Sequence, residues 1–214
     1  AIYDPVRDRM IIARGVGAGG TSFDDVWELT LSGTPAWNPI TATGAPPAAW
    51  QRQSAVYDSN RDRMIVFGGE RDPYYGGLYA FNDVWALSLA GSPAWAALTP
   101  AGTPPSPRIG HSAIYDPVRD RMLVFGGARW PDVLNEVWAL SLSGSPTWTQ
   151  LIAAGTPPDP RVRHTAIYDA PRDRMLVFGG VSAGGNQNDV WALSLAGTPE
   201  WTLLTPSGIP PSGR

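Results

Sequence analysis

The 214-residue sequence contains no cysteine and no lysine, so all 16 of its basic residues are arginine. The absence of cysteine excludes disulfides and thiolate metal sites, although it fits either redox compartment. No apolar run reaches the roughly 18 residues that a membrane helix needs, and no charged and then apolar leader is present. The arginines are scattered and the formal net charge is -3, which is unlike a nucleic-acid footprint. We therefore expect no membrane, no nucleic acid and no cofactor as partners.

One ten-residue phrase is repeated along the chain. AIYDPVRDRM begins at Ala1 and returns unchanged at Ala113, while AVYDSNRDRM begins at Ala55 and AIYDAPRDRM at Ala166. The spacings are 54, 58 and 53 residues. A period near 50 residues is typical of a repeat architecture.

Each repeat predicts four short strands. In the third copy these are HSAIYD, RMLVFGG, EVWALSL and TWTQL, separated by turn residues such as Asp116 and Pro117. Sheets that are apolar on both faces must pack on one another, and four in series most economically surround an axis. We predict an all-β fold, a β-propeller of four-stranded antiparallel blades. It forms a single repeat domain over 1–214, with blades at about 1–41, 55–99, 113–152 and 166–205 and proline-rich links between them.

Three further features resemble kelch repeats. Paired glycines end the second strand of units two to four, Asn-Asp or Asn-Glu precedes a Val-Trp, and a second Trp follows ten residues later. The first unit departs from this pattern with Ala13-Arg14-Gly15. We expect Tyr115 to pack between blades and eight framework tryptophans to be buried; these are Trp27, Trp37, Trp85, Trp95, Trp138, Trp148, Trp191 and Trp201.

Strand direction places the second turn of each blade and the interblade links on one face. Its second turns read VGAGGTSFDD, ERDPYYGGLYAFND, ARWPDVLNE and VSAGGNQND, so this variable face differs from blade to blade. Loops on a rigid scaffold often carry binding residues, and Tyr, Trp and Arg dominate interface hot spots. An alternative is that Tyr79 and Phe81 only pin their loop. The candidate ligand-binding residues are Arg71, Tyr74, Tyr75, Tyr79, Arg129 and Trp130 in the turns and Trp50, Arg52 and Arg163 in the links.

Two histidines, His111 and His164, precede inner strands at equivalent positions. A metal site would need convergent ligands, but the matching residue of the second unit is Gln53. We therefore predict no metal site and a hydrogen-bonding role inside the blade. The kelch resemblance suggests acids such as Asp83 as the partners.

These features favour a non-catalytic binding module or scaffold that engages a protein or a glycan through the variable face. A lyase or glycosidase that uses loop carboxylates such as Glu70, Asp72 or Asp132 is a rival hypothesis. A scaffold or array segment without a ligand is another. The copper chemistry of galactose oxidase, which has a kelch-like domain, needs a cysteine and is excluded. The arginine, alanine, glycine and proline usage suggests a bacterial protein, located outside the cytoplasm.

The outer flanks of the first and last blades are predicted to be apolar. Four blades in an open arc would expose these flanks to water, and exposed patches of that kind normally find a partner. We therefore expect a homodimer in which two copies meet head to tail and close an eight-bladed ring. A four-bladed ring that closes alone is the alternative.

Overall fold

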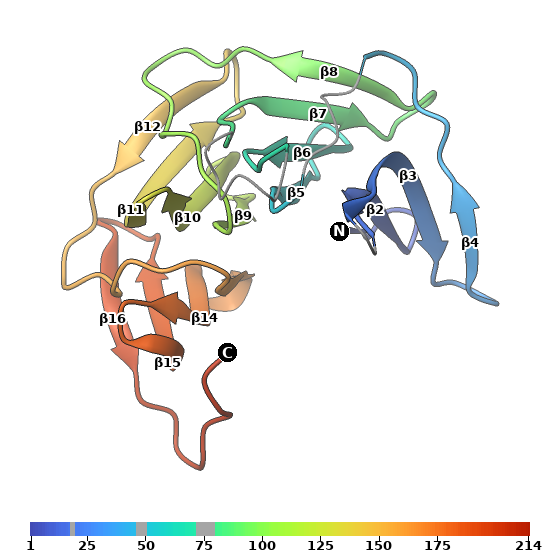
Figure 1. The fold of residues 1–214 in the computed structure, drawn as a ribbon. Coiled ribbons are helices and arrows are strands. Elements are labelled where there is room, and N and C mark those ends of the chain that lie inside the picture. Colours follow the sequence, from blue (N-terminus) through green and yellow to red (C-terminus); the bar gives the residue numbers. More distant parts are fainter. Residues whose placement is uncertain (18–19, 46–50, 72–79) are drawn as a thin grey trace.

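The computed structural model describes residues 1–17, 20–45, 51–71 and 80–214. Within these residues, four four-stranded antiparallel sheets follow one another as the blades of a propeller, and they form an arc (Figure 1). The predicted all-β fold is confirmed. No helix in the described part of the chain is long and apolar enough to cross a membrane.

Each blade is built in sequence order, from an inner strand near the axis to an outer strand. A short 3-10 turn, η3 (Ala170–Arg172), lies in the first turn of blade four. The strands are β1 (Ile2–Asp4), β2 (Arg9–Val16), β3 (Ser22–Thr30) and β4 (Ala36–Pro39) in blade one; β5 (Ser54–Asp58), β6 (Arg63–Phe67), β7 (Val84–Ser88) and β8 (Ala94–Leu98) in blade two; β9 (Ser112–Asp116), β10 (Arg121–Arg129), β11 (Asp132–Ser141) and β12 (Thr147–Leu151) in blade three; and β13 (Thr165–Asp169), β14 (Arg174–Ser182), β15 (Gly185–Ser194) and β16 (Glu200–Leu204) in blade four.

The repeated phrase forms the inner strand and the first turn of each blade. In blade three, Asp116 Oδ1 accepts hydrogen bonds from the backbone N–H groups of Val118 at 3.1 Å and Arg119 at 3.2 Å. Asp4 does the same in blade one. These Asx turns, which the aspartates predict, close the hairpin, and each turn also holds an aspartate with a left-handed backbone, Asp8 at φ +46 and Asp120 at φ +47.

The second turn of blade three is shorter than predicted. β10 continues to Arg129 and β11 already begins at Asp132, so most of ARWPDVLNE is strand and only Trp130 and Pro131 form the turn. The pairing shifts register between Phe125 and Gly127, and Gly126 there has φ +62. A glycine bulge of this kind lets the ribbon bend and continue instead of ending.

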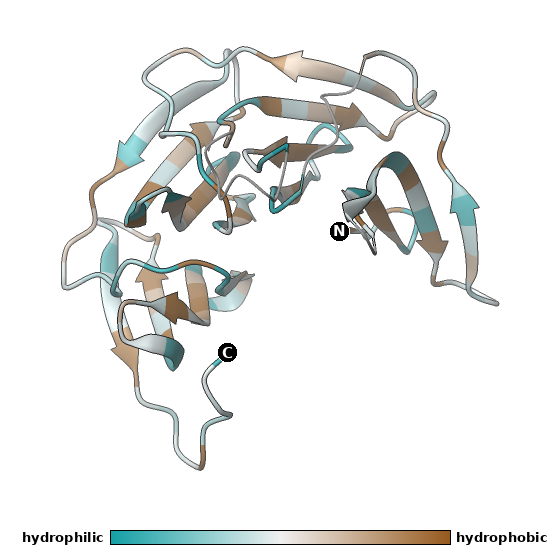
Figure 2. Ribbon diagram, in the orientation of Figure 1, coloured by the Kyte–Doolittle hydropathy of each residue, from teal (hydrophilic) through white to brown (hydrophobic). Residues whose placement is uncertain are grey.

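Apolar clusters between successive blades form the core. Between blades two and three, Phe67 and Ile65 pack with Met122, Val124 and Trp148, and Tyr115 packs against this cluster as predicted. The middle strands are rich in hydrophobic residues, whereas the outer strands β4 and β12 are more polar (Figure 2). The blades therefore stabilise one another face to face.

The expectation that all eight framework tryptophans are buried holds for Trp95, Trp148 and Trp201, is only partly met by the half-buried Trp85, Trp138 and Trp191, and is wrong for blade one. Trp95, Trp148 and Trp201 are 6%, 4% and 5% exposed, but their equivalent Trp37 is 50% exposed and Trp27 is 37% exposed. The reason is positional, because no blade in the described arc covers the face of blade one that points away from blade two.

Arginines of the first turns connect neighbouring blades on the face opposite the variable face. Arg7 forms two hydrogen bonds to Asp62, at 2.9 and 2.6 Å, and Arg119 pairs in the same way with Asp173. Each of these aspartates also accepts a hydrogen bond from a tyrosine hydroxyl of its own blade. The repeated Arg-Asp-Arg thus joins each blade to the next.

Candidate binding site on the variable face

The interblade links approach one another on the variable face. Arg52, Gly110 and Arg163 occupy the same place in the repeat, three residues before the alanines at 55, 113 and 166. All three have left-handed backbones, with φ +58, +63 and +59. The Gly110 N–H donates to the Arg52 carbonyl at 3.3 Å, and the Arg163 N–H donates to the Gly110 carbonyl at 2.8 Å. Three links from different blades are thereby joined at one place.

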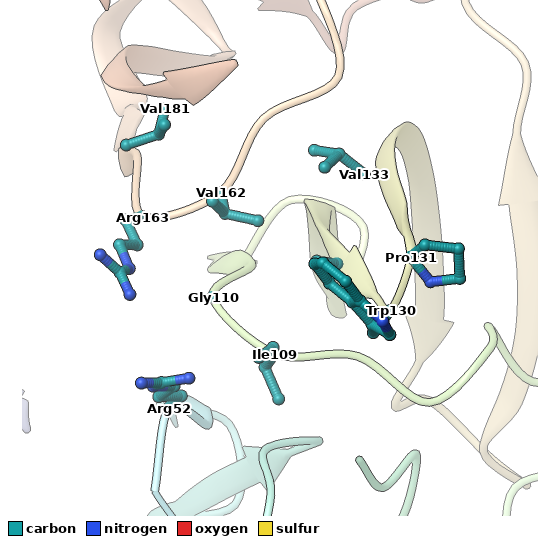
Figure 3. A pocket seen from close by; sticks show the side chains of 10 residues that line it. Arg52, Ile109, Gly110, Trp130, Pro131, Val133, Val162, Arg163 and Val181 are labelled. Carbon is teal, nitrogen blue, oxygen red and sulfur yellow. The ribbon is translucent and has the colours of Figure 1, made fainter. Parts of the chain in front are cut away.

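A pocket of about 320 Å³ opens beside these links. Its polar corner holds Arg52 and Arg163, and the Trp130 ring stands across from them (Figure 3). The remaining wall is mainly aliphatic and is made by Ile109, Gly110, Ala128, Pro131, Val133, Val162 and Val181. Blades two, three and four therefore all contribute to one concave site.

The two arginines of the pocket differ in their partners. Arg52 Nη1 lies 2.8 Å from Glu70 Oε1, and the Glu70 side chain is fully buried. This ion pair holds the Arg52 guanidinium in place. Arg163 is exposed, and no ion pair joins it to a carboxylate of the described residues. The pocket therefore combines one compensated and one uncompensated cation.

Trp130 owes its position to the tight turn between β10 and β11. Its side chain is 69% exposed, and Val133 on the other side of the turn is 42% exposed. A second hollow, of about 400 Å³, shares Val133, Val162 and Val181 with the pocket and extends to Pro160 and Ala183. The two hollows share these three valines and together extend from the links toward blade four; we call them the groove.

Three of the nine candidate residues meet in this pocket, namely Arg52, Trp130 and Arg163. Arg71 and Arg129 are exposed but do not line it. Trp50, Tyr74, Tyr75 and Tyr79 lie outside the described residues. Gly110 and the aliphatic wall were not predicted from the sequence. The shared repeat position of Arg52, Gly110 and Arg163 was the available signal for the glycine.

The histidines serve the framework, but the predicted bond inside the blade to an acid such as Asp83 is wrong, because His111 of blade three contacts Ser54 of blade two. His111 Nε2 lies 2.8 Å from Ser54 Oγ, and its ring packs edge-on against Phe67 at 5.1 Å. Burial first, and then the charge of Arg108, lower the pKa of His111 to about 3. The acids before Val-Trp pair with link arginines instead, as in Arg108 with Glu136 at 2.6 Å and Arg161 with Asp189 at 2.7 Å.

The two candidate carboxylates that the structure describes, Glu70 and Asp132, do not line one site. Glu70 is buried in its pair with Arg52, Asp132 is exposed at the start of β11, and Asp72 lies outside the described residues. No acidic side chain is among the described residues that line the pocket. The described part of the chain also contains no cluster of three or more His, Asp or Glu that could hold a metal ion.

Comparison with known proteins gives matches along the whole chain. The KLHDC2/KLHL20/DRC7 Kelch-repeats domain matches residues 80–214. Adagio-like protein 1 of Oryza sativa subsp. japonica is 29% identical over 219 residues, which cover 98% of this chain and 33% of the relative. Host cell factor 2 of Homo sapiens is 30% identical over 231 residues, covering 98% of this chain and 27% of the relative.

A solved structure shares the fold. The structure of YjhT superposes with a TM-score of 0.61 at 18% identity, covering 85% of this chain and 52% of that chain. The chain spans about a third of the length of the two curated relatives named above. Those relatives are from a plant and a mammal, so they give no support to the bacterial origin that the composition suggests.

Proposed function

The chain belongs to the kelch-repeat family of β-propellers, and on that premise we propose that it is a protein-binding module whose partner docks on the variable face. The observation that carries this proposal is the pocket of Arg52, Trp130 and Arg163. An exposed tryptophan beside arginines in a concave, mostly apolar site has the chemistry of an interface hot spot. The rigid arc supplies the preorganisation that reduces the entropy cost of binding.

Selection from a phage-displayed library of random peptides tests this function. The chain is immobilised, and the enriched peptides are measured against Trp130→Ala and against Val118→Ala. Val118 is a matched control because it is 68% exposed, close to the 69% of Trp130, but lies in a first turn on the opposite face. We expect Trp130→Ala to weaken binding and Val118→Ala to leave it unchanged. Equal effects of the two substitutions would contradict the proposed face.

A glycan is the second candidate ligand, because the exposed Trp130 ring could stack on a sugar face. The same pair of variants on a glycan array distinguishes the two ligand classes. Binding to glycans that Trp130→Ala abolishes, without any enrichment of peptides, would replace the protein partner by a carbohydrate. The expected result is enrichment of peptides and no glycan signal.

We also propose a second copy of the chain as a partner, at the two outward faces of the arc. Tyr3 is 52% exposed on blade one and Ile167 is 61% exposed on blade four, whereas Ile114, the equivalent of Ile167, is 4% exposed between blades. The charges are complementary too. Arg172 is the blade-four equivalent of Arg7 and is 65% exposed. Asp8 is the blade-one equivalent of Asp62, which accepts the hydrogen bonds of Arg7. Head-to-tail docking would bring Arg172 and Asp8 together in the homodimer.

Sedimentation velocity of charge variants tests this contact. Arg172→Asp and Asp8→Arg should each weaken self-association, because each places like charges together. The two substitutions combined in one chain should restore it. A wild-type chain that remains monomeric at all concentrations would contradict the homodimer while leaving the proposal for the variable face intact.

A further inference from the structure

We propose that the segment after β16 forms a docking site for strand β4 of a second copy of the chain. The docking site consists of Ser207, Gly208 and Arg214 in that segment, together with Phe178 of β14. Blade one, which carries β4, and blade four lie at the two ends of the arc (Figure 1). This inference rests on the homodimer proposed above and names the residues that hold the two copies together.

The docking site surrounds a hollow of about 330 Å³, which Phe178, Ser207 and Gly208 help to line. Its own blade fixes the segment that forms its rim. The Arg214 N–H donates to the Gln187 carbonyl at 3.0 Å, and the Arg214 carbonyl accepts a hydrogen bond from a glycine of β14 at 2.7 Å. The docking site is therefore preformed, which reduces the entropy cost of binding.

Gly208 keeps open a space that the three earlier links fill. Each of those links has a glycine with a left-handed backbone against the carbonyl oxygen of the next blade's outer tryptophan. An added Cβ would lie 2.4, 2.5 and 2.6 Å from that oxygen in the pairs Gly44 with Trp95, Gly102 with Trp148, and Gly155 with Trp201. Gly208 also has a left-handed backbone, with φ +95, but an added Cβ there would meet no described atom within 4 Å. The place of a tryptophan carbonyl is thus empty.

Trp37 of β4 matches this place. Its equivalents Trp148 and Trp201 are 4% and 5% exposed, and each ring packs at 5.0 Å against a phenylalanine in the second strand of the preceding blade. Trp37 is 50% exposed. Phe178 is the blade-four equivalent of those phenylalanines and lines the hollow. Docking of β4 would remove both rings from water, which favours association.

The backbone also provides for this contact. The Trp148 N–H of blade three donates to the Ala101 carbonyl of the preceding link at 2.9 Å, and the same bond recurs before blades two and four. Ser207 occupies the place of Ala101 after blade four. A docked β4 would therefore donate its Trp37 N–H to the Ser207 carbonyl.

An ion pair completes the contact. Arg161, in the link before blade four, is buried, pairs with Asp189 at 2.7 Å, and donates from Nε to the carbonyl two residues earlier. Arg214 makes the same local hydrogen bond at 3.3 Å but is exposed. Asp25 is the blade-one equivalent of Asp189, and Trp27 Nε1 donates to it at 2.7 Å. Both halves of a charged pair are thus preset, one on each end of the arc.

Mixing two charge variants tests the contact by sedimentation velocity. Asp25→Arg and Arg214→Asp each place like charges together, so each variant alone should self-associate at least about 100-fold more weakly than wild type. In an equimolar mixture, every junction between unlike chains again joins an arginine to an aspartate. The mixture should therefore regain the wild-type association constant to within about 3-fold. Asp132→Arg and Arg129→Asp are matched controls, because both residues are exposed on blade three, and each should self-associate as wild type does.

A second pair of variants tests the open space. Gly208→Asn fills it, since asparagine tolerates a left-handed backbone, and should weaken self-association by roughly 10-fold or more. Gly197→Asn is its control, because Gly197 has φ +66 and open space in the third turn of the same blade.

Three outcomes would contradict the inference. If wild type self-associates but the single charge variants do so equally well, or if their mixture does not recover, the docking site is wrong while the homodimer stands. Equal effects of Gly208→Asn and Gly197→Asn would likewise remove Gly208 from the contact. A wild-type chain that stays monomeric at all concentrations would overturn both the docking site and the homodimer.

Discussion

Arg61 of blade two donates two parallel hydrogen bonds to Asp120 of blade three, from Nη1 to Oδ1 at 2.9 Å and from Nη2 to Oδ2 at 2.7 Å. Arg61 also contacts Asp58 of its own first turn, and Tyr115 donates its hydroxyl to Asp120 at 2.9 Å. Neutral side chains could not replace this arrangement, because bidentate pairing depends on the guanidinium fork.

Arg61→Ala is expected to lower the free energy of unfolding by roughly 1–3 kcal/mol, since it leaves Asp120 without its charged donor. Arg172→Ala is the control in dilute solution. Arg172 is the equivalent residue of blade four, is 65% exposed and contacts only Asp169, at 3.4 Å, among the described residues. Its loss should cost less than about 1 kcal/mol. Urea denaturation measures both, and equal losses would show that the contact between blades contributes nothing.

The histidines predict an acid-dependent loss of stability. Burial lowers the pKa of His111 to about 3 and that of His164 to about 4, whereas an unfolded histidine titrates near 6.5. The unfolded chain therefore binds more protons between these values, and stability falls as the pH drops from about 6.5 toward 4. His111→Gln combined with His164→Gln copies Gln53 of blade two and should flatten this dependence. An unchanged slope of unfolding free energy against pH would contradict it.

Two glycines with similar backbones should respond differently to alanine. Gly102 has φ +80 and an added Cβ would lie 2.5 Å from the Trp148 carbonyl, whereas Gly144 has φ +62 and open space. Gly144→Ala should cost about 1–2 kcal/mol for the left-handed backbone. Gly102→Ala should cost roughly 1–3 kcal/mol more, because the link between blades must also move. Thermal unfolding compares the two, and equal costs would mean that the link tolerates the shift.

The tryptophans at the ends of the repeats should differ by position. Trp148→Ala removes a ring that is 4% exposed and packs against Phe67 at 5.0 Å, so we expect a loss of about 3–5 kcal/mol. Trp37 is the equivalent residue but is 50% exposed. Trp37→Ala should cost less than half as much in a monomeric chain. A comparable loss would mean that its face is covered in solution.

The repeat made the fold predictable. Four copies of one phrase, with turn aspartates and alternating apolar strands, determine the blade, and the paired glycines locate its bulge. The exposure of each framework tryptophan could not be predicted in the same way. Trp37 and Trp148 look alike in sequence, although only Trp148 is covered by a neighbouring blade. The links between blades through Arg61 and Asp120 depend on a contact 59 residues apart, which no local pattern reveals.

The candidate site was only partly predictable for a related reason. Arg52, Trp130 and Arg163 were selected by residue type and face, and the structure places them in one pocket. Gly110 could not be predicted as a site residue, because a glycine carries no recognition chemistry of its own. Its place in the pocket follows only from the positions of the three links in space. Arg71 and Arg129 satisfied the same chemical criteria but lie outside the pocket.

A crystal structure of the chain with its most enriched peptide tests the central claim most directly. The account predicts that the peptide lies along the groove between blades three and four. It should occupy the pocket beside Arg52 and Arg163, and one of its side chains should contact the Trp130 ring. A peptide bound on the first-turn face near Val118, or bound on the variable face without any contact to Arg163 and Trp130, would contradict the account.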